Sequence, residues 1–233
     1  MHSISNPIAD VRNRIASAAR AAGRQSESVS LVAVSKTQSV DKIRMAVANG
    51  INEFGENYLN DALPKIDALR DLRLRWHFIG AVQSNKTRDI ARCFQWVQTL
   101  DRSSIAQRLS DQRPDDAEPL DVLIQINIDA ERSKAGIAPE ALAEFAARTV
   151  VLPRLRLRGL MAIPRPETEP GRQRSAFRRM RELFDTGRPA GATQWDTLSM
   201  GMTVDFETAI AEGATMVRIG TALFGPRGLP QDG

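Results

Sequence analysis

Short, mostly apolar segments recur along the chain, and a longer stretch with apolar residues at helical spacing follows each one. These segments span residues 31–35, 51–54, 76–79, 96–100, 122–128, 155–160, 197–200 and 216–219. They do not alternate apolar and polar residues, which is the pattern of parallel strands buried on both faces. Eight strand-and-helix units predict an α/β fold, a single (β/α)8 TIM-like barrel.

The pattern before the first strand predicts an extra helix over about residues 8–22. A chain of 233 residues fits one barrel domain. The proline-rich segment 164–171 predicts an exposed loop, and residues 226–233 predict a frayed tail. A doubly wound open sheet is the alternative fold, but no G-x-G-x-x-G motif follows the first strand.

Composition narrows the classes of function. Lysine and arginine total 32 against 28 acidic residues, and the arginine-rich stretch 172–181 predicts a solvated helix face rather than a nucleic-acid interface. Cys93 is the only cysteine and there are two histidines, so neither a disulfide nor a metal site is expected. No signal peptide or apolar stretch of membrane-spanning length is present, which predicts a cytoplasmic protein without a membrane partner.

Ligands of such barrels bind where the strands end, so the residues that follow each strand form the candidate site. Lys36 follows the first strand, where desolvation can lower the pKa of its amine and prepare it to form a Schiff base. Donors follow the last two strands on Ser199, Gly201, Gly220 and Thr221, and they suit an anion such as phosphate. The alternatives are a helix cap for Ser199, as for Thr203, and turns for the two glycines.

Arg218 lies inside an otherwise apolar strand. A buried guanidinium without a partner is costly, so it needs an acceptor on a protein carboxylate or on a ligand. Position alone leaves open whether Asn57 caps a helix or binds a ligand, and whether Met161 packs or contacts one. His77, within a strand, is expected to be a core histidine, with ring contact to a ligand as the alternative.

Several motifs of the chain together resemble the pyridoxal phosphate homeostasis proteins. The resemblance runs from about residue 8 to 227, and the motifs are VAVSKT (32–37), FGENY (54–58), WHFIG (76–80), QSNK (83–86), SKAGI (133–137), GLM (159–161), LSMGM (198–202) and VRIGT (217–221). Ala81 and Thr203 depart mildly from the family pattern, in which proline and serine are usual.

The resemblance implies a fold-type III barrel for pyridoxal 5'-phosphate (PLP), similar to the N-terminal domain of alanine racemases. By the same resemblance, Lys36 carries the cofactor covalently and Arg218 faces the pyridine nitrogen. The residues that hold the phosphate or line the pocket are then Ser199, Gly201, Gly220, Thr221, Asn57 and Met161.

An arginine at the pyridine nitrogen keeps that nitrogen unprotonated and weakens the ring as an electron sink. Racemases of this kind take a second base, a tyrosine, from an extra domain of the other subunit, whereas the single tyrosine here, Tyr58, is expected to pack. The resemblance therefore implies a non-catalytic carrier in intracellular PLP homeostasis, a monomer or weak dimer with PLP-dependent apo-enzymes as partners. The alternative is a low-activity PLP-dependent amino-acid racemase.

Overall fold

The strands form one closed parallel barrel in chain order. The computed structural model describes residues 5–131, 134–165 and 170–225. The strands are β1 (Ser30–Val34), β2 (Glu53–Glu56), β3 (Arg75–Phe78), β4 (Trp96–Leu100), β5 (Leu120–Gln125), β6 (Leu155–Met161), β7 (Thr197–Ser199) and β8 (Met216–Ile219). Pairing of β1 with β8 closes the ring, so the predicted (β/α)8 barrel is confirmed.

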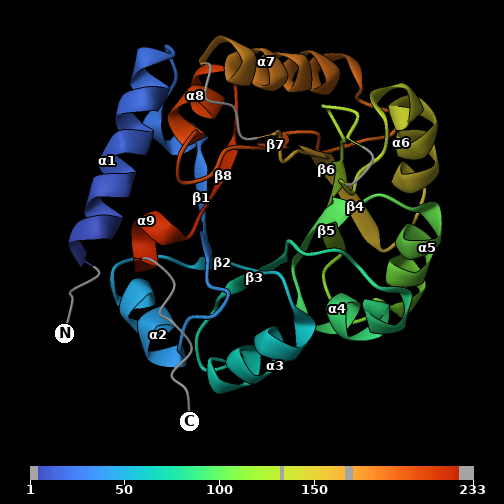
Figure 1. The fold of residues 1–233 in the computed structure, drawn as a ribbon. Helices are drawn as coiled ribbons and strands as arrows, with labels where there is room; N and C mark the ends of the chain where they lie inside the picture. Colours follow the sequence, from blue (N-terminus) through green and yellow to red (C-terminus); the bar gives the residue numbers. More distant parts are fainter. Residues whose placement is uncertain (1–4, 132–133, 166–169, 226–233) are drawn as a thin grey trace.

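The helices surround this ring (Figure 1). They are α1 (Ser5–Ala21), α2 (Val40–Ala48), α3 (Leu59–Ala68), α4 (Thr87–Cys93), α5 (Ser103–Gln112), α6 (Leu142–Val150), α7 (Pro170–Thr186), α8 (Phe206–Ala211) and α9 (Thr221–Phe224). Three short 3-10 helices also occur, namely η1 (Ser26–Ser28), η2 (Ser84–Lys86) and η3 (Pro139–Ala141). Among the described helices, none is both long enough and apolar enough to cross a bilayer.

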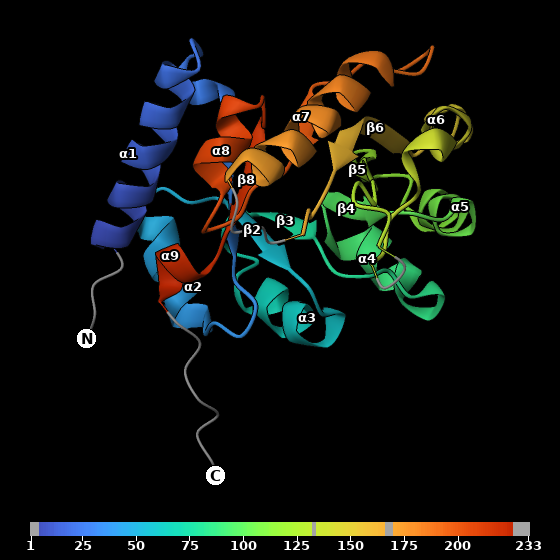
Figure 2. The same ribbon diagram turned by 45° about the horizontal axis from the view of Figure 1, so that its top comes forward.

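The predicted N-terminal helix is α1, which packs against α8 and α9 on the outside of the barrel (Figures 1 and 2). Ile8, Val11, Ile15 and Ala19 are buried along one side of it, at the spacing of an amphipathic helix.

Several sequence predictions differ from the structure at their boundaries; the strand predicted over 51–54, for example, is β2 at Glu53–Glu56. Residues 170–171 were expected in the proline-rich loop, but they begin α7, because proline is well tolerated in the first turn of a helix. The strand predicted over 122–128 ends at Gln125. The predicted tail 226–233 lies outside the described residues.

Charged residues cluster where the strands begin. The Asp121 carboxylate is buried and accepts hydrogen bonds from Arg156 Nε at 2.5 Å and Arg158 NH1 at 3.2 Å. The guanidinium groups of Arg158 and Arg75 lie 4.9 and 5.8 Å from the ring centroid of Trp96, within reach of cation–π attraction. This cluster fills the barrel at the end opposite the predicted site.

Candidate functional site

A cavity of about 230 Å³ opens where the strands end, between β1, β8 and the loop after β7. It brings together the predicted residues Lys36, Arg218, Gly220 and Thr221. The rest of its lining comprises Val34, Thr37, Gln38, Met202, Thr203, Val204 and Gly225. Lys36 and Arg218 are the only ionisable side chains among these described lining residues, so the cavity has a cationic lining.

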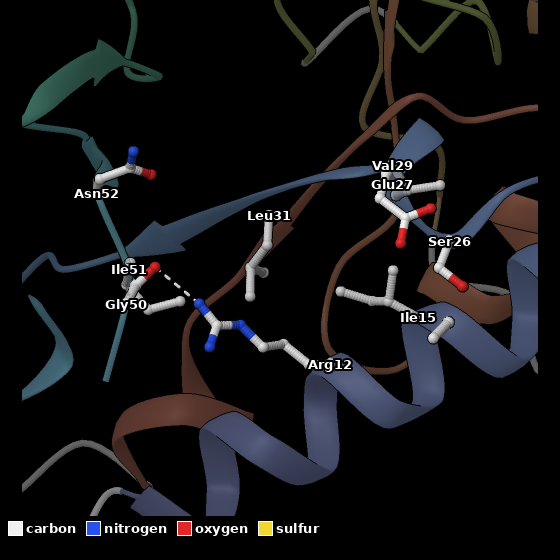
Figure 3. A pocket seen from close by; sticks show the side chains of 10 residues that line it. Arg12, Ile15, Ser26, Glu27, Val29, Leu31, Gly50, Ile51 and Asn52 are labelled. Atoms are coloured by element: carbon white, nitrogen blue, oxygen red, sulfur yellow. Dashed lines mark hydrogen bonds between the residues drawn. The ribbon is translucent and has the colours of Figure 1, made fainter. Parts of the chain in front are cut away.

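A second pocket, of about 420 Å³, lies between α1, η1 and the segments that lead into β1 and β2 (Figure 3). Arg12 extends over it and donates to the backbone oxygens of Asn49 and Gly50 at 2.8 and 2.7 Å. None of the predicted site residues lines this pocket.

Lys36 lies in a tight turn directly after β1. The backbone N–H of Gln38 donates to the Ser35 oxygen at 3.0 Å, and Thr37 has a φ of 64°. A β-branched residue in this left-handed region is strained, and such strain concentrates at functional positions. Lys36 is therefore followed directly by a residue with a strained backbone conformation.

A buried ionic triad fixes the residue before Lys36. Lys65 Nζ on α3 donates to Glu56 Oε1 at 2.8 Å and to the Ser35 oxygen at 2.9 Å. The Ser35 hydroxyl donates to the same Glu56 oxygen at 2.6 Å. Through these hydrogen bonds, Ser35 at the end of β1 is connected to Glu56 on β2 and to Lys65 on α3. Sequence reasoning did not identify Lys65, because nothing in a helical sequence shows which lysine is buried.

Arg218 is 3% exposed, and the acceptors of its guanidinium hydrogen bonds are neutral. Its NH1 group donates to Ser199 Oγ at 2.6 Å, and its NH2 group donates to the Ala162 oxygen at 3.0 Å. Burial lowers the pKa of Arg218 to about 10, although the nearby Asp205 carboxylate acts in the opposite sense. Arg218 is therefore a hydrogen-bonded cation that still borders the cavity.

Ser199 and Gly201 lie behind the cavity rather than in its lining. The fully buried Ser199 hydroxyl donates to Gln98 Oε1 at 2.7 Å while it accepts from Arg218. Gly201 has a φ of 93°, and a Cβ there would lie 2.7 Å from the Ala209 Cβ. The positive φ and the close approach to α8 are sufficient reasons for a glycine at this position, without any contact to a ligand.

Asn57 and Met161 also lie outside the lining of the Lys36 cavity. Asn57 lines two neighbouring cavities, of about 230 and 270 Å³, and its buried Oδ1 has no hydrogen-bond partner within the described part of the chain. Met161 is fully buried in the barrel interior, in a cluster with Val32, Trp96, Leu123 and Met216.

Of the two alternatives for Thr203, the structure favours the site over the helix cap. Thr203 lines the cavity, and α8 begins after Asp205, whose Oδ1 accepts from the Met202 N–H at 2.6 Å. Gln98 was not noticed, although a lone amide in the strand 96–100 was a visible signal.

His77 is a fully buried core histidine inside the barrel. Its Nδ1 accepts from Gln98 Nε2 at 2.9 Å, and its Nε2 donates to Glu53 Oε2 at 3.1 Å. Burial lowers the pKa of His77. Burial alone would raise the pKa of Glu53, but the hydrogen bond from His77 and the nearby cations outweigh it, so this pKa is lowered. His77 is thus neutral beside an ionised Glu53.

The buried His77 should make stability depend on pH. The unfolded chain takes up a proton on this histidine below pH ~6.5, whereas the folded chain resists it, so stability is complete above that pH and falls below it. Urea unfolding of the wild type should therefore show a decline of up to about 1.4 kcal/mol per pH unit below pH ~6.5 from this residue. The His77→Gln variant should lose that component, and a His2→Ala control should keep it. Equal slopes in wild type and His77→Gln would contradict this assignment.

Comparison with known proteins places this barrel among its relatives. The family model for the alanine racemase N-terminal domain matches residues 8–228. A protein of Pseudomonas aeruginosa named pyridoxal phosphate homeostasis protein is 56% identical over 227 residues, with 97% of both chains covered. The protein of that name from Escherichia coli is 50% identical over 230 residues, with 97% of this chain and 98% of the relative covered.

Solved structures agree with this placement. The structure of PipY from Synechococcus elongatus with PLP bound matches with a TM-score of 0.80 and 32% identity, covering 95% of this chain and 100% of PipY. Alanine racemase from Corynebacterium glutamicum shares the fold, with a TM-score of 0.65 and 19% identity, and the match covers 95% of this chain but 62% of the racemase. The chain therefore belongs to the family of pyridoxal phosphate homeostasis proteins and has the barrel of the alanine racemase N-terminal domain.

Proposed function

We propose that this chain binds PLP, holds it covalently on Lys36, and acts in PLP homeostasis by storing or delivering the cofactor without turning over a substrate. The observation that carries the proposal is the shared cavity of Lys36 and Arg218 at the end of the barrel where the strands finish. The names of the relatives and the PLP bound to PipY support the choice of ligand. PLP-dependent apo-enzymes are the proposed recipients.

The chemistry of the cavity fits a phosphorylated pyridine aldehyde. Two cationic side chains, from Lys36 and Arg218, and hydroxyls from Thr37, Thr203 and Thr221 lie in its lining, and no carboxylate occurs among the described lining residues. The hydroxyls can donate to phosphate oxygens, while the amine suits the aldehyde and the guanidinium suits the ring nitrogen. Gly220 keeps space beside β1, since a Cβ there would lie 3.3 Å from the Val34 oxygen.

Lys36 supplies the amine for covalent binding. Its Nζ forms a carbon–nitrogen double bond with the aldehyde carbon, and the aldehyde oxygen leaves as water. Its half-buried position, fixed by the turn and by the buried triad behind Ser35, keeps the amine at the cavity. Bound PLP supplies an electrophilic carbon joined to an electron-withdrawing ring.

Arg218 donates to the pyridine nitrogen in this proposal and so leaves it unprotonated, which weakens the ring as an electron sink. A racemase also needs a base on each face of the substrate, but the described lining residues contain no carboxylate, imidazole, thiol or phenol. Tyr58 is 64% exposed and lines a different cavity, beside Asn57. These features support a carrier over the racemase alternative.

The remaining predicted site residues keep proposed roles. Gly220 and Thr221 line the cavity and form the phosphate cup, Gly201 sets the turn behind it, and Ser199 holds Arg218 with its hydroxyl. Asn57 offers a buried oxygen without a partner in the described chain. Met161 precedes Ala162, whose carbonyl oxygen holds Arg218.

Lys36→Ala should abolish attachment of PLP that sodium borohydride can fix, since Lys36 is the one amine among the described residues that line the cavity with Arg218. The half-buried lysine contributes little to the core, so the unfolding midpoint should hardly change. Mass spectrometry of the reduced protein measures the adduct, and Lys86→Ala, in the neighbouring cavity, is the matched control. Peptide mapping that placed the pyridoxyl group on Lys86 or Lys134 in the wild type would show this assignment to be wrong.

Thr221→Ala should weaken PLP by about one to two decades and pyridoxal much less, since a donor to a charged phosphate contributes about 1.5–3 kcal/mol. Ser199→Ala should instead weaken both ligands to a similar degree, because this hydroxyl binds Arg218 rather than lining the cavity. Fluorescence titration with PLP and with pyridoxal measures the ratio of the two dissociation constants in each variant. Equal weakening of both ligands by Thr221→Ala would remove Thr221 from the phosphate cup.

The carrier proposal predicts no turnover of amino acids. In deuterated water, the PLP-loaded protein should exchange the α-protons of the standard amino acids no faster than free PLP does, because the lining residues that the structure describes offer no second base beside Lys36. Proton NMR measures the exchange. Exchange above the rate of free PLP that disappears in Lys36→Ala would favour the racemase alternative.

A further inference from the structure

A chain of buried polar side chains runs from the cavity into the barrel interior. Arg218 NH1 and Ser199 Oγ are 2.6 Å apart, and Ser199 Oγ and Gln98 Oε1 are 2.7 Å apart. Gln98 Nε2 lies 2.9 Å from His77 Nδ1, and His77 Nε2 lies 3.1 Å from Glu53 Oε2. The first four residues are at most 3% exposed, whereas the Glu53 side chain, at the start of β2, is 20% exposed. We call this the Arg218–Glu53 chain.

The two ends of the Arg218–Glu53 chain, together with the neutral His77 between them, fix the direction of the hydrogen bonds in it. A guanidinium can only donate and an ionised carboxylate can only accept. Ser199 therefore accepts from Arg218, and His77 Nε2 donates to Glu53. Because His77 is neutral, its Nδ1 accepts from Gln98 Nε2, so Gln98 Oε1 faces Ser199 and accepts from its hydroxyl.

Gln98 is the residue on which this direction depends. Its Nε2 group donates to His77 Nδ1 and also to Met216 Sδ at 3.2 Å, while its Oε1 accepts from Ser199. A flipped amide would face Ser199 with its donors and His77 with its acceptor. His77 would then have to move its proton to Nδ1 and present a bare nitrogen to the Glu53 carboxylate. With a neutral His77, only the observed orientation satisfies both ends.

The remaining interior side chains show that such a chain is not needed to fill the barrel. Val32, Trp96, Leu123, Met161 and Met216 pack there as an apolar cluster. Polar groups at this depth are costly unless every hydrogen bond is made, so they restrict the structure to one arrangement. The Arg218–Glu53 chain therefore restricts the orientation of the Arg218 guanidinium, to which it is joined through Ser199.

We infer that Gln98, through Ser199, is a positioning residue that orients the Arg218 guanidinium toward the ring nitrogen of PLP. The inference rests on the proposed function. Gln98 itself does not line the cavity, so it acts on the ligand only through this chain. Loss of Gln98 should then affect recognition of the ring nitrogen and leave recognition of the phosphate and aldehyde unchanged.

The experiment compares PLP with an analogue in which a C–H group replaces the ring nitrogen. Dissociation constants for both ligands are measured in the wild type, in Gln98→Met, which keeps the side-chain length but lacks the amide, and in Thr149→Val. Thr149 is the matched control, since its buried hydroxyl donates to the Phe145 oxygen at 2.8 Å on α6, away from the cavity. Circular dichroism confirms that each variant is folded.

The wild type should bind PLP about tenfold more tightly than the analogue, the effect of one charge-assisted hydrogen bond. Gln98→Met should bring this ratio close to one, and Thr149→Val should keep it. If Gln98→Met does not fold, the smaller change Ser199→Ala breaks the first link of the chain and should lower the ratio in the same way.

A wild-type ratio that persists in Gln98→Met, or in Ser199→Ala where the former does not fold, overturns the inference. Equal affinity of the wild type for both ligands, with borohydride-fixable attachment of each, also overturns it but leaves the proposed function standing. A wild-type protein that takes up neither ligand defeats the proposed function, and the inference falls with it.

Discussion

The buried guanidinium of Arg218 is the constraint on which the arrangement of the site depends. A cation in the interior is stable only if its hydrogen bonds are made, and here the acceptors are a hydroxyl and a backbone carbonyl. Its pKa, lowered to about 10 by burial, remains high enough that the group stays charged near neutral pH. Within the Arg218–Glu53 chain, the negative charge is on Glu53, at the opposite end from Arg218. A cation held by neutral acceptors at the edge of a cavity is well placed to donate to a ligand.

The barrel around this cation leaves one end for the ligand. Where the strands begin, Asp121 and its arginines fill the interior, and where they end, the cavity brings Lys36 and Arg218 together. On the outside of β1, the ion pair of Lys65 with Glu56 fixes the backbone from which Lys36 projects. Buried ion pairs of this kind are better explained by the single conformation that they specify than by net stability. Arg218 lies within β8, and Lys36 therefore lies in a turn whose first residue, Ser35, is held by this ion pair.

The sequence was sufficient for the barrel and for the place of Lys36 at the end of β1, because apolar strands and the residues after them form a local pattern. The partners of Arg218 could not be predicted, since they depend on contacts across the barrel. Arg218 and Ala162, for example, are 56 positions apart in the chain. The same reason explains why the sequence could not show that Met161 and Asn57 lie outside the lining of the Lys36 cavity. The boundary at Pro170 was wrong because proline both breaks helices and begins them.

The central claim is that PLP lies between Lys36 and Arg218 with an unprotonated ring nitrogen that accepts a hydrogen bond. Nitrogen-15 NMR of PLP labelled at that nitrogen and bound to the protein tests this claim most directly. The account predicts the chemical shift of a neutral, hydrogen-bonded pyridine in the wild type and a change of that shift in Arg218→Leu. A shift typical of a protonated pyridinium in the wild type, or one that Arg218→Leu leaves unchanged, would contradict it.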